Sequence, residues 1–324
     1  MKTLITGGAG YIGSHCVKKF LEQGHEVVVL DNLSRGHQEA VPQNVELEVI
    51  NLLDADKLKP LLEKHKIEAI VHFAAFAYVG ESVESPAEYY QNNVVGSFNL
   101  IKAAAEIGIK KFVFSSTCSL YGNPDSIPIS EEESIKPINP YAKTKMMVEN
   151  ILADFNRAYG LNYVALRYFN AAGADPSGSI GESHEPETHL IPLVIQTALG
   201  EREKILVFGD DYKTEDGTCI RDYIHVNDLS DAHLKALEYL NDGNESTAIN
   251  LGTGSGFSVL EIIKEVEKIA DAPVKFEIVD RREGDPAVLV ADNKKAKKLL
   301  GWSPQNKLSD IILHALNWHK NPKY

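Results

Sequence analysis

The sequence predicts an α/β protein with a doubly wound parallel sheet and a smaller mixed α/β domain. In the first half of the chain, short apolar runs rich in β-branched residues alternate with longer segments of helical periodicity. These runs are continuous rather than alternating in polarity, which suits strands that helices cover on both faces. A glycine cluster separates the first run from the first helix, as in sheets that bind nucleotides at their carboxyl edge.

The continuous apolar runs are the expected strands of the main sheet. They cover residues 3–6, 26–30, 45–50, 69–74, 111–116, 163–167 and 248–251. The expected helices cover residues 14–21, 54–65, 86–107, 141–159, 190–200, 226–240, 258–270 and 308–319. Residues 171–187 are rich in Gly, Pro, Ser and Glu and are expected to form a loop. Two further apolar runs, at 205–208 and 274–279, are expected to form a smaller sheet.

Composition and charge narrow the classes of function. A net charge of -13 argues against nonspecific binding to nucleic acid. The cysteines, Cys16, Cys118 and Cys219, are widely spread and odd in number, which is typical of reduced thiols. The sequence shows no Cys/His spacing typical of a metal site, no signal peptide and no apolar run of membrane-spanning length. We therefore expect a cytoplasmic protein that binds no metal, no nucleic acid and no membrane.

The glycine cluster follows the first expected strand. Gly7, Gly10 and Gly13 allow a tight turn, let the backbone approach a pyrophosphate and direct a helix N-terminus at it. The second strand ends at Asp31, whose carboxylate suits the ribose hydroxyls of an adenosine and repels a 2′-phosphate. Strand, glycines, helix, strand and acid in this order predict a dinucleotide site that prefers NAD to NADP.

The sequence pattern changes near residue 171, where the regular alternation of expected strands and helices is followed by the expected loop. We expect residues 1–170 to form the NAD-binding domain, of Rossmann type, joined by returning segments near 222–252. Residues 171–324 are expected to form the smaller domain, which is interleaved with the first and holds the substrate.

A second candidate centre begins at Asn139-Pro140, which suits the start of a helix. Tyr141 and Lys145 then lie one turn apart on one helix face. A phenol titrates near pH 10, and a nearby ammonium and a helix N-terminus both favour its ionised form. Lowering that pKa by about 3 units requires roughly 4 kcal/mol, which a cationic nicotinamide ring would help to supply. Tyr141 is therefore a candidate base; the alternative is an ordinary exposed helix face.

Further short motifs accompany the glycine turn, Asp31, Thr117 and the Tyr141/Lys145 pair. They are His72-Phe73-Ala74, Gly80-Glu81-Ser82, Tyr89-Tyr90, Asn92-Asn93-Val94, Arg167-Tyr168-Phe169-Asn170, Gly217-Thr218, Arg221-Asp222-Tyr223-Ile224-His225-Val226 and Arg281-Arg282-Glu283-Gly284-Asp285. With these motifs the chain resembles, over nearly its whole length, the extended short-chain dehydrogenases/reductases. Within them it is most similar to the NAD-dependent nucleotide-sugar 4-epimerases.

The resemblance implies an isomerase that interconverts UDP-galactose and UDP-glucose through a 4-keto sugar with tightly bound NAD. Tyr141 would be the base, Thr117 its hydrogen-bonding partner and Lys145 the third catalytic residue. Besides these residues and the glycines, the implied NAD contacts are Tyr11, Ile12, Asp31, Asn32, Leu33, Ser34, Arg35, Gly36, Asn51, Leu52, Phe73, Ala74, Ala75, Asn92, Tyr168 and Phe169. Besides Thr117 and Tyr141, the implied UDP-sugar contacts are Asn170, His189, Leu190, Leu206, Val207, Phe208, Arg221, Tyr223, Arg282, Asp285 and Leu289.

The chain departs from the family pattern at three positions. Asn51 occupies a position that is often Asp near the adenine, and Ala77 replaces a lysine that touches the cofactor in some members. His189 replaces an asparagine near the sugar. None of these changes removes a group that the chemistry requires.

Related reactions fit the residues less well. Sugar 4,6-dehydratases carry an Asp-Glu pair after the residue that corresponds to Thr117, where this chain has Cys118-Ser119. A UDP-glucuronate decarboxylase is disfavoured because it too needs an acidic residue there, and Asp31 disfavours an NADPH-dependent reductase. From another class, a catalytically silent NAD-sensing protein is the alternative, although such a protein need not keep Thr117, Tyr141 and Lys145 together.

The sequence leaves more than one candidate for the sugar of the UDP-sugar substrate. Leu289 matches the family position at which tyrosine narrows the sugar pocket, so UDP-N-acetylhexosamines are further candidate substrates. Residues 115–122 and 137–141 also resemble UDP-arabinose 4-epimerases, which leaves UDP-pentoses as the alternative. One small substituent changes binding by only about 1–3 kcal/mol, so we expect overlap among these sugars. The resemblance also implies a homodimer, formed through the helices at 86–107 and 141–159.

Overall fold

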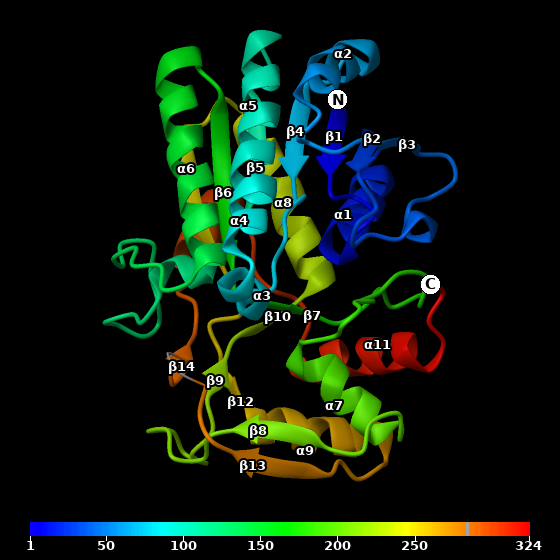
Figure 1. Ribbon diagram of the computed structural model, residues 1–324, viewed down its shortest axis with the longest axis vertical. Helices are drawn as coiled ribbons and strands as arrows, with labels where there is room; N and C mark the ends of the chain where they lie inside the picture. The colour runs from blue at the N-terminus through cyan, green and yellow to red at the C-terminus, as the bar shows by residue number, and fades with distance from the viewer. Residues whose placement is uncertain (283–284) are drawn as a thin grey trace.

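Seven parallel strands form the main sheet of the computed structural model, which describes residues 1–282 and 285–324 (Figure 1). The strand order is β11-β6-β5-β4-β1-β2-β3. The strands are β1 (Lys2–Thr6), β2 (Glu26–Asp31), β3 (Glu46–Val49), β4 (Ala69–His72), β5 (Lys111–Thr117), β6 (Asn162–Tyr168) and β11 (Thr247–Leu251). The direction of winding reverses between β1 and β4, where Thr6 lies opposite His72. Sheets of this kind bind ligands at the carboxyl ends of the strands beside the reversal.

Helices cover both faces of this sheet (Figure 1). One face packs against α1 (Tyr11–Glu22), α8 (Val226–Asn241) and α10 (Lys294–Leu300). The other face packs against α2 (Ala55–His65), α5 (Gly96–Glu106) and α6 (Pro140–Tyr159). Neighbouring residues of a strand enter opposite cores, as Leu4 and Ile5 do, and this is why the runs are apolar throughout. The predicted doubly wound parallel sheet is confirmed.

The remaining elements gather beyond the carboxyl edge of the sheet, at the bottom of Figure 1. A separate apolar core lies among α7 (Leu190–Ala198), α9 (Val259–Ala270) and α11 (Leu308–Lys320). Short sheets accompany it: β8 (Ile205–Phe208) with β13 (Phe276–Val279), β12 (Phe257–Ser258) with β9 (Ile220–Arg221) and β14 (Val288–Leu289), and β10 (Tyr223–His225) with β7 (Asn170–Ala172). The expected smaller mixed α/β part is therefore present.

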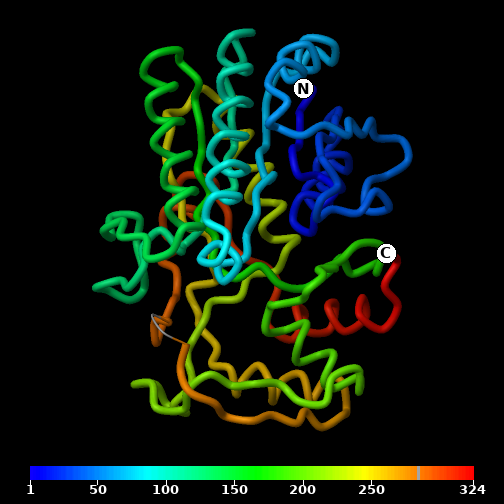
Figure 2. Tube along the Cα trace, in the orientation of Figure 1, coloured from blue at the N-terminus to red at the C-terminus, as the bar shows by residue number. Residues whose placement is uncertain are grey.

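The chain passes between these two parts several times (Figure 2). The strand β11 and helix α8 return to the main sheet, as the sequence predicts, and α10 with Trp302 returns a second time and packs against α8. We propose that the two parts are the predicted domains, with residues 294–302 joining the NAD-binding domain. In the described part of the chain, none of the helices combines the length and apolarity that crossing a membrane requires.

The predicted elements agree with the structure to within a few residues, with some informative differences. Residues 86–107 are not one regular α-helix: α4 (Pro86–Tyr89) is followed by a π-helical segment (Tyr90–Val95) and then by α5. The helix α1 begins at Tyr11 rather than at the predicted residue 14, and β4 ends at His72 rather than at the predicted residue 74. The short strands β7, β9, β10, β12 and β14 and the helices α3 (Val79–Glu84) and α10 were not predicted, because so few residues carry too little periodicity.

Candidate active site

The turn between β1 and α1 requires glycine and leaves backbone N–H groups free. Gly7 has a φ of +70°, and a Cβ on it would lie 2.6 Å from the backbone nitrogen of Ala74. A Cβ on Gly13 would lie 2.1 Å from the carbonyl oxygen of Gly7. Within the described residues no side chain caps α1, so the N–H groups of Tyr11 and Ile12 have no partner inside the helix. Such a turn fits a bound pyrophosphate.

Asp31 lies at the carboxyl end of β2 and is buried. Its Oδ2 accepts the N–H of Ala9 at 3.0 Å and its Oδ1 accepts the N–H of Leu33 at 2.9 Å. Burial raises the pKa of Asp31, and these hydrogen bonds oppose that rise. A carboxylate has about four acceptor positions, so both oxygens can still receive ribose hydroxyls. Asp31 therefore fits the role that the sequence predicts for it.

The residues after Asp31 fold back over the glycine turn. Leu33 has a φ of +58°, and a Cβ on Gly36 would lie 2.9 Å from the carbonyl carbon of Ala9. A cleft beside this segment is lined by residues 33–37, Tyr78 and residues 183–185. Asn32, Leu33, Ser34, Arg35 and Gly36, all expected to contact NAD, thus lie next to the predicted pyrophosphate site.

Tyr141, Lys145 and Thr117 meet where β5 and α6 come together. Asn139 caps α6 by accepting the N–H of Ala142 at 2.8 Å, as its position in the sequence predicts. Tyr141 is 8% exposed and Lys145 is 3% exposed, and the Lys145 ammonium lies 5.9 Å from the centre of the Tyr141 ring. Thr117 ends β5, and its hydroxyl accepts the N–H of Ser119 at 3.1 Å. The alternative of an ordinary exposed helix face is wrong.

Burial dominates the electrostatics of this centre. Burial raises the pKa of Tyr141 well above its ordinary value, and the nearby Thr117 hydroxyl opposes the rise. Burial also lowers the pKa of Lys145 to about 7, while the charge of Glu149 opposes that change. Desolvation therefore outweighs the expected help from Lys145 and the helix N-terminus. The protein's own groups hold Tyr141 as a neutral phenol, and its ionisation needs a further positive charge.

A buried ion pair stabilises the position of α6, the helix that carries Tyr141 and Lys145. Arg167 donates to Glu149 through Nε at 2.9 Å and through Nη2 at 2.6 Å, in a two-point contact between β6 and α6. Glu149 also accepts from Ser116, and Arg167 donates to Tyr121 at 3.0 Å. Sequence reasoning missed Glu149, although it lies one turn after Lys145 on the face of α6 that faces the sheet. The network fixes α6, and with it Tyr141, against β5 and β6.

A second missed residue, Asn93, ties the π-helical segment to α6. Its amide group bonds both the N–H and the carbonyl of Phe76, at 2.8 and 2.9 Å, and donates to the Thr144 hydroxyl at 3.1 Å. Thr144 in turn donates to the Tyr141 carbonyl at 2.6 Å. Asn92, which was expected to contact NAD, donates to the Asn93 carboxamide at 2.9 Å. The Asn92-Asn93-Val94 motif thus carries a residue that positions the start of α6.

Several other expected cofactor residues line the same edge of the sheet. Phe73, Ala74 and Ala75 directly follow β4, and Ala74 touches the glycine turn. Tyr168 ends β6, where its hydroxyl lies 2.6 Å from that of Ser115. The remaining members are placed as follows: Asn51 accepts the N–H of Leu53, Leu52 is buried against α5, and Phe169 packs in a small cluster with Cys118, Tyr121 and Leu289.

The expected sugar-nucleotide residues lie across from this edge. Asn170 in β7 bonds the Asp222 carbonyl through both its N–H and its side chain, each at 3.0 Å, which fixes β7 beside β10. Arg221 is paired with Asp285 at 2.5 Å, and Leu289 is aligned with Arg221 in the β9–β14 pair. Tyr223 is buried beside them. Glu283 and Gly284, which belong to a motif quoted above, lie outside the described residues.

Side chains of β8 alternate between buried and partly exposed positions along the strand. Val207 is buried in the smaller core, so its side chain is turned away from ligands, whereas Leu206 and Phe208 are partly exposed. The Arg282 guanidinium lies 3.9 Å from the centre of the Phe208 ring. His189 precedes Leu190 at the start of α7, and its Nδ1 lies close to the carboxylates of two glutamates.

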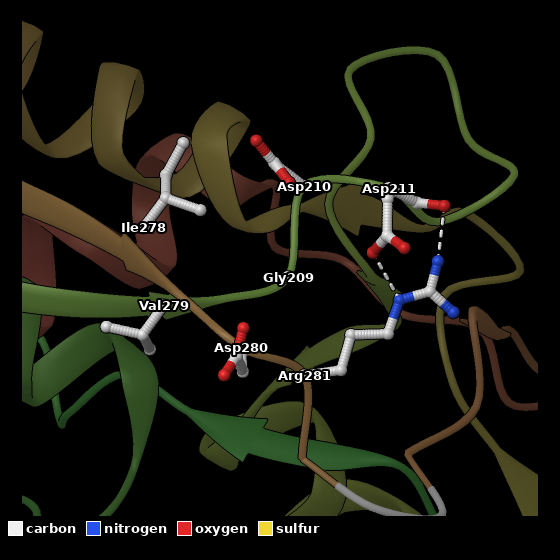
Figure 3. Close-up of a pocket in the computed structure, with 7 residues that line it drawn as sticks. All are labelled: Gly209, Asp210, Asp211, Ile278, Val279, Asp280 and Arg281. Atoms are coloured by element: carbon white, nitrogen blue, oxygen red, sulfur yellow. Dashed lines mark hydrogen bonds and ion pairs between the residues drawn. The ribbon is translucent and has the colours of Figure 1, made fainter.

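A pocket at the ends of β8 and β13 does not fit the substrate (Figure 3). Its lining includes the carboxylates of Asp210, Asp211 and Asp280. The neighbouring Arg281 is held by the side chain and the carbonyl of Asp211, as the dashed lines in Figure 3 show. An acidic lining whose guanidinium is already paired repels a diphosphate. We therefore place no substrate group in this pocket.

Comparisons with known proteins agree with this arrangement. Residues 3–252 match the model of the NAD dependent epimerase/dehydratase family, and the chain belongs to that family. The UDP-glucose 4-epimerase of Halalkalibacterium halodurans is 52% identical over 99% of this chain and 96% of its own length.

Solved structures give the same result. A UDP-glucose 4-epimerase from Brucella ovis in complex with NAD is 48% identical, with a TM-score of 0.95 over 97% of both chains. A UDP-glucose 4-epimerase from Stenotrophomonas maltophila, with bound NAD and formylated UDP-arabinopyranose, is 40% identical, with a TM-score of 0.96 over 99% of this chain and 98% of that one. The similarity therefore extends through both parts of the fold.

Proposed function

We propose that the protein is a UDP-glucose 4-epimerase, an isomerase that interconverts UDP-galactose and UDP-glucose through a 4-keto sugar with tightly held NAD. The observation that carries the proposal is the buried Tyr141/Lys145 pair at the carboxyl edge of a sheet whose first turn fits a dinucleotide. The relatives and neighbours of the chain bear the same activity in their names, and two neighbours hold NAD.

The chain's own residues would hold NAD along the carboxyl ends of the strands. The N-terminus of α1 would bind the pyrophosphate, and Asp31 would receive the hydroxyls of the adenosine ribose. Phe73, Tyr168 and Phe169 would border the nicotinamide half. When bound, NAD supplies a reversible hydride acceptor at sugar carbon 4 and a positively charged ring.

Tyr141 would act as the base and the acid. Its oxygen takes the proton from the sugar 4-hydroxyl during oxidation and returns it to the 4-oxygen during reduction. Because burial holds Tyr141 as a neutral phenol, its pKa would fall toward the working range only beside the positive charge of a bound cofactor. Proton removal would thus depend on a loaded site. Thr117 would keep the phenol oxygen aligned, and Lys145 would hold the cofactor ribose.

The smaller part of the fold would hold the UDP group. Arg221 and Arg282 would neutralise the diphosphate, because guanidinium groups match pairs of phosphate oxygens. Asn170 and Tyr223 would form the wall between the nucleotide and the sugar. Binding energy placed on the UDP leaves the sugar free to turn, so that either face of the 4-keto group can be reduced.

The position of Leu289 supports a broader sugar range. It packs against the small cluster that contains Phe169, an expected cofactor contact, and is aligned with Arg221, an expected substrate contact. A leucine there leaves more room than a tyrosine. We propose that UDP-N-acetylglucosamine and UDP-N-acetylgalactosamine are also substrates.

We propose a homodimer that is formed through α5 and α6. Large apolar side chains of these helices and of the π-helical segment before α5 are exposed: Val95, Phe98, Met147 and Tyr159. Phe98 also packs at right angles against Phe155 across the two helices. Light scattering of the purified protein should give twice the mass of the chain, and Phe98→Asp should give the monomer; a monomeric wild type would contradict the proposal.

We further propose a cytoplasmic enzyme of galactose metabolism. The described cysteines Cys16, Cys118 and Cys219 are free and buried, which suits a reducing compartment. Deleting the gene should block growth on galactose and leave growth on glucose unchanged. Unimpaired growth on galactose would contradict this role.

The direct test of the activity is turnover of UDP-galactose by the purified protein with no cofactor added. UDP-N-acetylgalactosamine and UDP-xylose are assayed in parallel, and NAD is measured in the supernatant of the denatured protein. The proposal expects turnover of UDP-galactose and about one NAD per chain. Released NAD with turnover of UDP-xylose alone would instead identify a pentose epimerase.

A further inference from the structure

Four potential metal ligands converge in the segment between β7 and α7. They are Glu182, His184, Glu187 and His189, and one ligand atom of each lies within 4.8 Å of all the others. The segment runs past the N-terminal end of α1 and close to the C-terminal residues before it enters α7 (Figures 1 and 2). Glu182 is 3% exposed, so the cluster is closed on one side by the protein.

The distances within the cluster match those of a coordination sphere. Nδ1 of His189 lies 2.8 Å from Glu182 Oε1 and 3.0 Å from Glu187 Oε1. Nδ1 of His184 lies 3.3 Å from Glu182 Oε1 and 3.5 Å from Glu187 Oε2. Ligands at about 2.0–2.1 Å from a tetrahedral metal ion are about 3.3 Å apart. The four histidine–glutamate distances are thus within about 0.5 Å of this spacing, and all separations among the ligand atoms are below 4.8 Å.

Within the described residues, hydrogen bonding satisfies Glu187 and His189 but leaves atoms of Glu182 and His184 without partners. Each histidine turns a single Nδ1 toward oxygens of two carboxylates, and one nitrogen can donate only one proton. Among the described residues, the buried atoms Glu182 Oε1 and His184 Nδ1 have no hydrogen-bond partner despite their close neighbours. Oxygen and nitrogen atoms that approach closely without hydrogen-bond geometry are what lone pairs directed at one ion would produce.

The charges point to the same conclusion. Within residues 1–282 and 285–324, the ion pairs of Glu182 and Glu187 involve histidines and no lysine or arginine. Two carboxylates out of water need two positive charges. A divalent cation bound by neutral histidines supplies both charges.

We propose that Glu182, His184, Glu187 and His189 form a binding site for a divalent transition-metal ion, with zinc as the ion that best suits two imidazoles and two carboxylates. With four protein ligands the site is closed, as structural zinc sites are. The sequence does not predict this site, because the mixed E-x-H-x-x-E-x-H spacing lacks the cysteines and histidine pairs of common metal motifs.

The ion would fasten the 182–189 segment to its surroundings. The indole of Trp318 donates to the Glu182 carbonyl at 2.8 Å, and His37 lies 3.2 Å from the Ser183 carbonyl. The ring of Tyr11, at the start of α1, stands edge-on to His184 at 6.2 Å. Residues 183–185 line the predicted cofactor cleft, so the ion would stabilise one wall of that cleft. This consequence rests on the proposed function, whereas the metal site itself does not.

Another His/Glu group provides a matched control. Glu46, Glu48 and His65 also lie within ligand distance of one another. There the ammonium of Lys64 is 2.6 Å from Glu48, so a cation is already in place, and Glu46 is exposed. We expect no zinc site at this group.

The test is calorimetric titration of the untagged full-length protein with zinc chloride, after removal of metals with a chelator. We expect about one zinc per chain and a higher melting temperature with zinc. The double variant His184→Asn/His189→Asn should bind zinc about 100-fold more weakly or not at all, because even outer-shell changes cost 10–100-fold. The control variant His65→Asn should bind as the wild type does.

The outcomes separate the metal site from the proposed activity. A wild-type protein that binds no zinc, or a double variant that binds it unchanged, overturns the site. NAD content and UDP-galactose turnover are measured on the same samples. In the wild type, turnover without zinc binding overturns the metal site alone, and zinc binding without turnover overturns the activity alone. Circular dichroism of the variants confirms that they are folded.

Discussion

The ammonium nitrogen of Lys145 donates a 2.8 Å hydrogen bond to the carbonyl of Ser115 and lies 5.9 Å from the centre of the Tyr141 ring. This contact joins α6, which carries the proposed base, to β5, which carries Thr117. Both side chains are almost fully buried, so water screens little of what is bound beside them. A positive ring near Tyr141 would therefore act strongly on its pKa.

The buried pair Glu149–Arg167 should be costly to break. Glu149→Gln leaves the Arg167 guanidinium buried without its counter-charge, and we expect the free energy of unfolding to fall by about 3–5 kcal/mol. Urea denaturation measures the change. The exposed pair Asp154–Arg157 on the same helix is the control, and Asp154→Asn should cost about 0.5 kcal/mol or less. Equal losses in the two variants would contradict a supporting role for the buried pair.

Replacing Gly7 should weaken cofactor binding. Gly7→Ala brings a Cβ within 2.6 Å of the Ala74 backbone at a φ of +70°. We expect at least about a tenfold loss of co-purified NAD, equivalent to roughly 1.4 kcal/mol. Gly24→Ala is the matched control, because Gly24 has a φ of +76° but an added Cβ meets no described atom within 4 Å. It should lose about 1–2 kcal/mol of stability and keep its NAD; NAD loss in both variants would argue against steric crowding at Gly7.

Sequence patterns are sufficient where the chemistry depends on neighbours along the chain. The glycine turn, Asp31 and the Asn139–Lys145 segment were predicted because a turn, a strand end and one helical turn fix their geometry locally. The doubly wound sheet was predicted for a similar reason, since continuous apolar runs indicate strands covered on both sides.

The rest depends on contacts between distant segments. Glu149 contacts Arg167 only when β6 pairs with β5. Asn93 contacts Thr144 only when the π-helical segment packs on α6. Burial raises the pKa of Tyr141, and this burial depends on the packing of the whole site. Periodicity and spacing carry no information on any of these.

Leu289 should govern the sugar range. Leu289→Tyr places a larger side chain beside Phe169 and Arg221, and we expect kcat/KM for UDP-N-acetylgalactosamine to fall about 10-fold or more relative to UDP-galactose. Steady-state assays on both sugars measure the ratio. Leu313→Tyr, at an exposed leucine of α11, should leave the ratio unchanged. Equal losses on both sugars in Leu289→Tyr would contradict a gate that selects by size.

Asp175 should stabilise the protein at neutral pH and lose this effect in acid. It pairs with Lys18 of α1 at 2.5 Å, and its hydrogen bonds and this charge lower its pKa to about 2 in spite of burial. The stabilisation is present above the unfolded pKa of about 4 and disappears as pH falls through about 2. Asp175→Asn should therefore lose about 2 kcal/mol at pH 7. Urea midpoints of the two proteins should converge as pH falls; a constant gap would contradict this account.

The most direct test of the central claim is the turnover number of Tyr141→Phe, measured together with its NAD content and its affinity for UDP. Tyr159→Phe, which removes an exposed phenol hydroxyl at the end of the same helix, is the control. The account predicts that Tyr141→Phe keeps NAD and UDP but epimerises UDP-galactose about 10²–10⁴-fold more slowly, while the control is unchanged. Near-normal turnover in Tyr141→Phe would contradict the claim that this residue moves the proton.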